Sequence, residues 1–262
     1  MHVERVSIPV ETRAPTGATN AYLVGESPAV LVDPAGRTDE LDALVEEHEV
    51  GTIAVTHTHP DHVGAVADYA AETGAELLAR RPERFAAATG VEPDRQIREG
   101  SEIGTGAGPV TVLDTPGHAV DHVAFDLGDG TVVSGDLAVA EGSVVVGGPE
   151  GDLRAYLTAL RRLWARDPDR LLPGHGPVID GDPTPRETLE RLIGHRLDRE
   201  RAVLDAVRGG ATDLESVVDA AYEKDVSGVR DLARATVRAH VEKLAVEGRV
   251  TWRPETGRVA PA

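Results

Sequence analysis

Residues 57–62 read His57-Thr58-His59-Pro60-Asp61-His62, directly after the apolar, strand-like residues 52–56. Side chains alternate along a strand, so His57 and His59 project to the same side and can share one metal ion. Pro60 suits the first position of a helix, which puts Asp61 and His62 in the first helical turn, where they can face a neighbouring metal position. This concentration of histidine and carboxylate at a strand-to-helix junction predicts a metal centre.

Three later turns that contain glycine each contribute one more metal-ligating side chain. They are residues 115–118, 134–136 and 173–176, and their candidate ligands are His118, Asp136 and His175. Glycine beside each candidate lets the backbone approach the site closely, because no side chain intervenes. Each turn alone is ordinary turn chemistry. Their combination with residues 57–62 indicates one shared site.

The residue types that are missing narrow the chemistry. The chain has no cysteine, so disulfides, iron–sulfur clusters and a cysteine nucleophile are excluded, and any metal is held by imidazole and carboxylate. The sequence has no Gly-x-Ser-x-Gly elbow, no phosphate-binding loop and no Gly-x-Gly-x-x-Gly nucleotide fingerprint. These absences agree with a metal-based reaction that needs no protein nucleophile.

The charge distribution is unusual. The formal net charge is -18, and Lys224 and Lys243 are the only lysines among the basic residues. All of the acidic excess lies in residues 1–185, because residues 186–262 contain equal numbers of acids and bases. A carboxylate-rich, lysine-poor surface keeps a protein hydrated and is typical of salt-loving microbes. The N-terminus resembles no signal peptide and no segment could span a membrane, so we expect a soluble, cytoplasmic, halophilic protein.

Alternating segments in the first two thirds of the chain predict an α/β domain. The expected elements include strands at residues 3–10, 20–24 and 29–32 and helices at 38–49, 61–73 and 153–166. Pro183 and Pro185 interrupt regular structure, which places a domain boundary at residues 181–185. We predict a catalytic domain at residues 1–182 and a small C-terminal domain at residues 186–262.

The C-terminal domain is predicted to contain three helices and then a β-hairpin, at residues 186–208, 214–222, 229–247 and 249–259. This order is typical of a winged helix, whose last helix commonly contacts nucleic acid. Arg230, Arg234 and Arg238 lie four residues apart on that helix and share one face. The face either follows the phosphates of a nucleic acid or is a solvated surface paired with nearby acids such as Glu242.

Residues 57–62, together with the three later candidates, resemble the signature of the metallo-β-lactamase superfamily, and the resemblance covers residues 1 to about 180. It implies the four-layer αββα sandwich of that superfamily. It also implies two metal ions, one held by His57, His59 and His118 and the other by Asp61, His62 and His175, with Asp136 bridging them. Because the chain has no cysteine ligand, β-lactam cleavage is not the expected activity.

The implied cofactor is a pair of divalent cations. Two such ions, about 3.5–4 Å apart, acidify a water molecule and polarise the oxygen of the bond under attack. Asp61 is then a candidate acceptor for the proton of that water as well as a ligand. Zinc is the first choice of metal, although iron and manganese suit the same ligands.

Two further polar residues near the candidate ligands have alternative interpretations. Asp33 either orients a ligating histidine, as the resemblance implies, or initiates a turn before Pro34. His122 either lines the substrate pocket or has a buried structural role. The sequence leaves both alternatives open.

Longer matches narrow the resemblance. Residues 115–125, residues 134–136 and the tail that begins at residues 194–204 resemble the β-lactamase-like protein 2 family across nearly the whole chain. For that family the implied activity is a zinc-dependent hydrolase that cuts single-stranded RNA. The alternatives are a thioester or ester hydrolase resembling glyoxalase II, with the tail as a lid, and a ligand-sensing regulator that binds DNA. In molar salt the Debye length is about 3 Å, which weakens phosphate steering and argues against nucleic acid.

Overall fold

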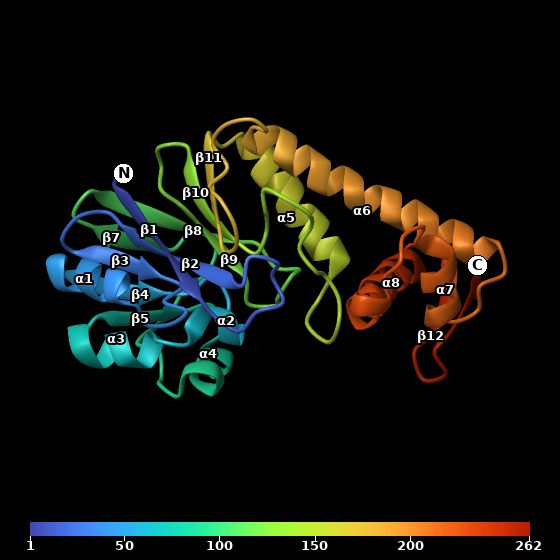
Figure 1. Cartoon of the computed structure of the whole chain (residues 1–262), viewed down its shortest axis with the longest axis horizontal. Helices are drawn as coiled ribbons and strands as arrows, with labels where there is room; N and C mark the ends of the chain where they lie inside the picture. Colours follow the sequence, from blue (N-terminus) through green and yellow to red (C-terminus); the bar gives the residue numbers. More distant parts are fainter.

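The computed structural model describes residues 1–262, and two β-sheets form the centre of the larger part of the chain, which precedes the helical tail (Figure 1). The first sheet has six strands in the order β1-β2-β3-β4-β5-β6. Strands β1 to β3 pair antiparallel, whereas β3 to β6 pair parallel because helices cross over between them. The bounds are β1 Val3–Pro9, β2 Ala18–Val24, β3 Ala29–Val32, β4 Val50–Ala54, β5 Glu76–Ala79 and β6 Arg95–Gln96.

The second sheet has five strands in the order β11-β10-β9-β8-β7. Strands β7 to β10 form an antiparallel meander, and β11 then pairs parallel to β10. The carboxyl ends of β8, β10 and β11 each lead into one of the glycine-containing turns. The bounds are β7 Glu102–Thr105, β8 Gly108–Asp114, β9 Val123–Asp126, β10 Thr131–Gly135 and β11 Arg170–Pro173.

The two sheets pack face to face between two helical layers, so the α/β class is confirmed. Buried side chains such as Tyr22 and Phe125 fill the space between the sheets. Tyr69 and Phe85 pack against the outer face of the first sheet, and Leu160 packs against the outer face of the second sheet. The helices that cover these faces are α1 Asp39–Glu47, α3 Val66–Thr73 and α4 Pro82–Thr89 on one side and α5 Leu153–Arg166 on the other.

One helix of the sandwich differs from the expectation. Residues 61–73 form two helices, α2 Pro60–Val63 and α3, rather than one. The Ala65 amide donates to the Pro34 carbonyl, and a Cβ at Gly64 would collide with the Ala35 carbonyl oxygen. The expectation of a single helix is wrong because this contact with the loop after β3 captures an amide that a continuous helix would pair internally.

A helical tail projects from one side of the sandwich (Figure 1). It has its own apolar core, to which Val207, Val218, Val241 and Val259 contribute. The three helices and the hairpin expected from the sequence are confirmed. The elements are α6 Pro185–Arg208, α7 Leu214–Ala221, a 3-10 turn at Ser227–Val229, α8 Arg230–Val246, β12 Val250–Arg253 and β13 Arg258–Pro261.

Helix α6 connects the tail to the sandwich. It begins after Thr184, whose hydroxyl accepts from the amide of Glu187 in a capping box. Leu189 and Leu192, near its start, pack with α5, while its last turns pack in the core of the tail. A helix of this length spans about 36 Å and so reaches from one core to the other. None of the helices in the protein is both long and apolar enough to cross a bilayer.

Candidate metal centre

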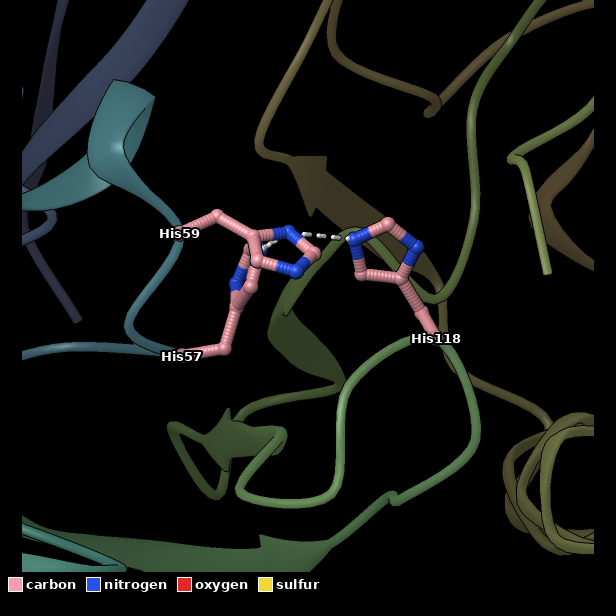
Figure 2. Close-up of side chains that lie close together, drawn as sticks. All are labelled: His57, His59 and His118. Carbon is pink, nitrogen blue, oxygen red and sulfur yellow. Dashed lines mark hydrogen bonds between the residues drawn. The ribbon is translucent and has the colours of Figure 1, made fainter. Parts of the chain in front are cut away.

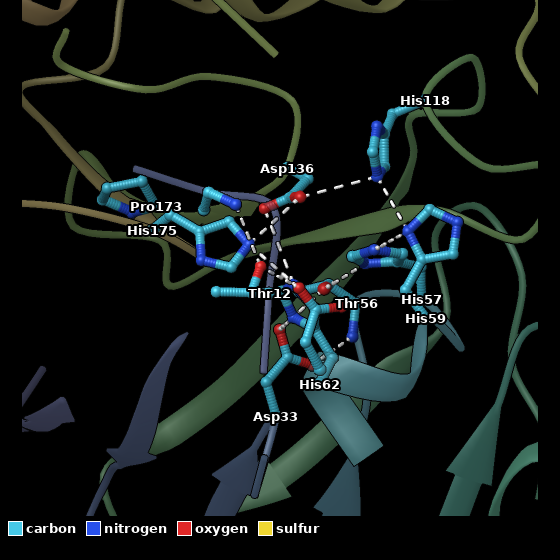
Figure 3. Close-up of polar contacts among 12 residues, drawn as sticks. Thr12, Asp33, Thr56, His57, His59, His62, His118, Asp136, Pro173 and His175 are labelled. Atoms are coloured by element: carbon cyan, nitrogen blue, oxygen red, sulfur yellow. Dashed lines mark hydrogen bonds and ion pairs between the residues drawn. The ribbon is translucent and has the colours of Figure 1, made fainter. Parts of the chain in front are cut away.

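All seven side chains singled out as candidate ligands lie together beyond the carboxyl ends of β4, β8, β10 and β11. Figure 3 labels six of them, all except Asp61. Four of them follow β4 of the first sheet and three follow strands of the second sheet. Each potential metal position is therefore lined from both sheets. The residues are His57, His59, Asp61 and His62 after β4, His118 after β8, Asp136 after β10 and His175 after β11.

Three of the histidines form one tight group, called here the three-histidine group. His59 Nδ1 lies 2.9 Å from His57 Nε2 and 3.0 Å from His118 Nε2 (Figure 2). His57 is buried, whereas His59 is the most exposed ligand of the group, with 31% of its side chain accessible. The group is thus open to the exterior on the side of His59.

A second group consists of Asp61, His62 and His175, and Asp136 lies between the two groups. Asp61 Oδ2 is 3.6 Å from His175 Nε2. The Asp136 carboxylate lies 3.5 Å from His118 Nε2, 3.4 Å from His175 Nε2 and 3.7 Å from His62 Nε2. Asp136 is the carboxylate that contacts histidines of both groups, which is the position of a bridging ligand.

The outer ring nitrogen of each histidine faces an acceptor. The Thr56 hydroxyl donates to Asp33, so it can only accept from His57 Nδ1, 3.0 Å away. Each of the other four outer nitrogens lies near one oxygen. The pairs are His62 Nδ1 and Asp33 Oδ2 at 2.9 Å, His118 Nδ1 and the Val145 carbonyl at 2.8 Å, His175 Nδ1 and the Ala18 carbonyl at 2.8 Å, and His59 Nε2 and Glu150 Oε2 at 3.6 Å. These partners place the ring protons outside.

When the rings are neutral, their inner nitrogens therefore carry lone pairs that face one another, an arrangement that repels itself unless a cation lies between them. His62 Nε2 and Asp136 Oδ1 are buried and have no hydrogen-bond partner. A Cβ at Gly174 would lie 2.5 Å from Asp136 Oδ1, so the backbone closes directly over these atoms. Unpartnered imidazole and carboxylate atoms in a closed cradle fit divalent metal ions.

Burial and neighbouring charges set the protonation of the centre. Burial, reinforced by the surrounding histidines, holds the pKa of His57 well below its usual range, so this ligand stays neutral. Burial also acts against protonation of His62, but Asp33 and Asp136 outweigh it and raise the pKa to about 9. A metal ion therefore has to displace a proton from His62, which makes metal binding weaker in acid.

The structure places Asp33 and His122 behind the ligands. Asp33 accepts from the Thr56 amide and faces His62 Nδ1, the contacts that an orienting role requires. His122 is 1% exposed, and its Nδ1 bonds to the Thr115 hydroxyl while its Nε2 accepts from the Asp136 amide. His122 does not line a pocket, because the ring is enclosed and both nitrogens are used. It supports the backbone of Asp136 instead.

Replacing Asp33 by asparagine should weaken metal binding about 10–100-fold, the typical cost of losing the outer partner of a ligating histidine. Asparagine has one acceptor oxygen, whereas the Asp33 carboxylate accepts from the Thr56 amide, the Thr56 hydroxyl and His62. Competition with a chromophoric chelator measures the affinity. Asp39→Asn, at an exposed position on α1, is the matched control. Equal affinities for the two variants would show that Asp33 does not orient a ligand.

The sequence did not indicate four partners of the ligands. The Thr12 hydroxyl donates to Asp61 Oδ2 at 2.5 Å, and Thr56 supports His57. Val145 contributes a carbonyl oxygen and Glu150 a carboxylate, both from the loop between β10 and α5. Of these four, only Thr56 gave a signal in the sequence, because it directly precedes residues 57–62. The Val145 carbonyl could not be predicted from the sequence, because every residue has a backbone carbonyl.

The arginine face on α8 is paired with acids. Arg230 contacts Glu215 at 2.9 Å and Asp219 at 2.7 Å. Arg234 contacts Glu215 at 3.0 Å, and Arg238 contacts Glu242 at 2.7 Å. The pairing favours a solvated, charge-balanced surface over a track for phosphates.

Comparison with known proteins agrees with this geometry. Residues 14–175 match the family model of the metallo-beta-lactamase superfamily. A beta-lactamase-like protein 2 homolog of Drosophila melanogaster is 29% identical over 254 residues, covering 88% of this chain and 84% of the relative. An atrochrysone carboxyl ACP thioesterase of Aspergillus chevalieri is 31% identical over 201 residues, covering 72% of this chain and 60% of the relative.

A solved metallo-beta-lactamase family protein from Thermus thermophilus shares the fold with a TM-score of 0.76 at 24% identity. That similarity covers 99% of this chain and 98% of the other, so it includes the helical tail. The family match covers more than half of the sequence and contains all seven clustered side chains. This chain therefore belongs to the metallo-β-lactamase superfamily of hydrolases.

Proposed function

We propose that this protein is a dinuclear metallohydrolase, with zinc as its metal, that cleaves small thioester or ester substrates. The observation that carries the proposal is the convergence of ring nitrogens from five histidines with the Asp61 and Asp136 carboxylates, while the outer nitrogens of His57, His62, His118 and His175 are hydrogen-bonded to other groups. In this assignment His57, His59 and His118 hold one ion and Asp61, His62 and His175 hold the other. Iron and manganese suit the same ligands.

The metal ions, when bound, supply an acidified water and polarise the carbonyl oxygen under attack. The chain contributes positioning and proton transfer. Asp136 holds the two ligand groups in register, and Asp61 accepts the proton that the water loses. The Thr12 hydroxyl bonds to Asp61 Oδ2 and leaves Oδ1 without a hydrogen bond within the chain, so that oxygen is available to accept the proton.

Two observations favour a thioester or ester over RNA. A relative named as a thioesterase aligns with 72% of this chain. The Arg230, Arg234 and Arg238 face, the candidate track for a phosphate backbone, is neutralised by acids. Cleavage of single-stranded RNA remains the second candidate, because similarity to beta-lactamase-like protein 2 homologs covers 88% of the chain.

We also infer that residues 1–182 are the catalytic domain and that residues 186–262 form a winged-helix-like domain. The separate apolar core of the tail and its order of three helices followed by a hairpin support this division. The ion pairs on α8 argue against a DNA-binding regulator, which would need free cationic side chains on its recognition helix.

Thiol release tests the proposal directly. Because the chain has no cysteine, a thiol-reactive dye reports hydrolysis of S-acylglutathione or acyl-coenzyme A without background from the protein. Assays should contain zinc and near-molar potassium chloride, as the acidic surface suggests. We expect thiol release by the wild type and none by His59→Ala. End-labelled single-stranded RNA is the parallel substrate, and RNA cleavage without thiol release would replace the thioester proposal by the nuclease one.

A further inference from the structure

The segment between β10 and α5, residues 137–152, contains no helix or strand and is called here the bridging loop. It provides the outer partners of two members of the three-histidine group. The Val145 carbonyl accepts from His118 Nδ1 at 2.8 Å, and Glu150 Oε2 faces His59 Nε2 at 3.6 Å. The conformation of this loop thus determines how two of the three rings are oriented.

Glu150 is fixed from its other side. Its Oε1 lies 2.5 Å from an amino group of Arg84 on α4, and this pairing lowers the pKa of the Glu150 carboxyl. Glu150 Oε2 is buried and has no hydrogen-bond partner within the chain. At 3.6 Å this oxygen is a charged neighbour of the outer nitrogen of His59 and not yet its hydrogen-bond partner. A carboxylate in that position is the usual partner of a metal-bound imidazole.

The backbone of the bridging loop is held by the tail. The Arg191 guanidinium on α6 donates to the carbonyls of Gly142 at 2.6 Å, Val139 at 2.9 Å and Ala140 at 2.9 Å. Five residues further along α6, Arg196 donates to the carbonyl of Val144, the residue before the partner of His118. These bonds replace the ladder that a strand or helix would have given the loop.

Arg196 shows how tightly this contact is enclosed. Its side chain is 2% exposed, the largest of the fully buried side chains, and its guanidinium lies 5.3 Å from the ring centre of Tyr156 on α5. Helix α8 closes over the same loop, because a Cβ at Gly147 would collide with the Ala235 carbonyl oxygen. Two helices of the tail therefore fix the loop from outside.

We propose that the tail is part of the metal centre, with Arg191 and Arg196 as positioning residues that act on the three-histidine group through the bridging loop. Val145 transmits their effect to His118, and Glu150 transmits it to His59. This inference rests on the metal centre proposed above. It gives the tail a role that needs no nucleic acid and does not depend on which substrate is cleaved.

Cobalt binding to the full-length protein tests the proposal. Arg191 is exposed and fills no part of the core, so Arg191→Ala leaves the packing intact, and Arg201→Ala on the same helix is the matched control because Arg201 pairs only with Asp198. Titration with Co²⁺, followed by visible absorption, reports the affinity and geometry of each bound equivalent. Circular dichroism verifies that each variant is folded.

We expect wild type and Arg201→Ala to bind two equivalents with the same spectra. In Arg191→Ala and Glu150→Gln one equivalent should bind about tenfold more weakly, at the lower end of the usual effect of an outer partner, with an altered absorption band. Arg196→Lys, which retains a donor, should be closer to wild type than Arg196→Met. If Arg191→Ala and Glu150→Gln bound two equivalents of cobalt with unchanged affinity and spectra, the role of the tail would be wrong but the metal centre would stand. If the wild type bound no cobalt, the metal centre would be wrong as well.

Discussion

Asp136→Asn should abolish metal-dependent hydrolysis while leaving the protein folded. Asparagine has the shape of aspartate, but it presents one neutral oxygen and an amino group where the carboxylate faces His118, His175 and His62 within 3.7 Å. Loss of a bridging ligand should exceed the roughly 100-fold upper effect of losing an outer partner of a ligand. It should also remove one of the two equivalents of bound metal.

The measurement is kcat/KM for thiol release, with metal content determined on the same sample. Asp180→Asn is the control, because Asp180 is exposed. Its ion pair with Arg170, at 3.8 Å, contributes little to stability. If Asp136→Asn, fully loaded with metal, kept activity within tenfold of the control, the role of Asp136 as the bridge would be wrong.

Gly174→Ala should disrupt the centre nearly as strongly, although it adds a single methyl group. The added carbon would lie 2.5 Å from Asp136 Oδ1 and 2.7 Å from His62 Cε1. Both of these atoms are in buried side chains, and Gly174 also pairs through its backbone with Gly135 and Asn20. The strain therefore has to be relieved by displacing ligands, and overpacking of this kind typically costs about 1–3 kcal/mol.

Chemical denaturation and metal titration measure both consequences. Gly181→Ala is the matched control, because position 181 has an ordinary backbone conformation and no atom within 4 Å of the added carbon. We expect the control to bind metal like the wild type and Gly174→Ala to bind one equivalent or none. Full metal binding by Gly174→Ala would show that the cradle is looser than these distances indicate.

The sequence predicted those helices, strands and turns whose pattern lies within a short stretch of residues. Strand alternation, apolar helical faces and the proline-rich turn before α6 depend on nearest neighbours, so most elements were expected to within a few residues. The division between α2 and α3 was not, because it arises from the Ala65 amide, which bonds to Pro34 in a different loop. No periodicity in residues 61–73 encodes that contact.

The same distinction applies to the site. The residue types at the seven positions were readable because imidazole and carboxylate at strand ends have few other uses in such a cluster. Which nitrogen faces inward was not readable, and His59 differs from its neighbours in directing Nδ1 toward the group. His122 could not be assigned from its identity, which fits a pocket as well as the support of the Asp136 amide. The contribution of Arg196 depends on packing between elements far apart in sequence.

Both ligand groups combine side chains that follow β4 of the first sheet with side chains that follow strands of the second. Each cation would therefore fasten one half of the sandwich to the other, so occupancy and unfolding are thermodynamically linked. Free metal at 100 times its dissociation constant adds about 2.7 kcal/mol per site to the free energy of unfolding. A cell short of the metal would then lose the protein itself to unfolding and proteolysis, and the abundance of the enzyme would follow the supply of its cofactor.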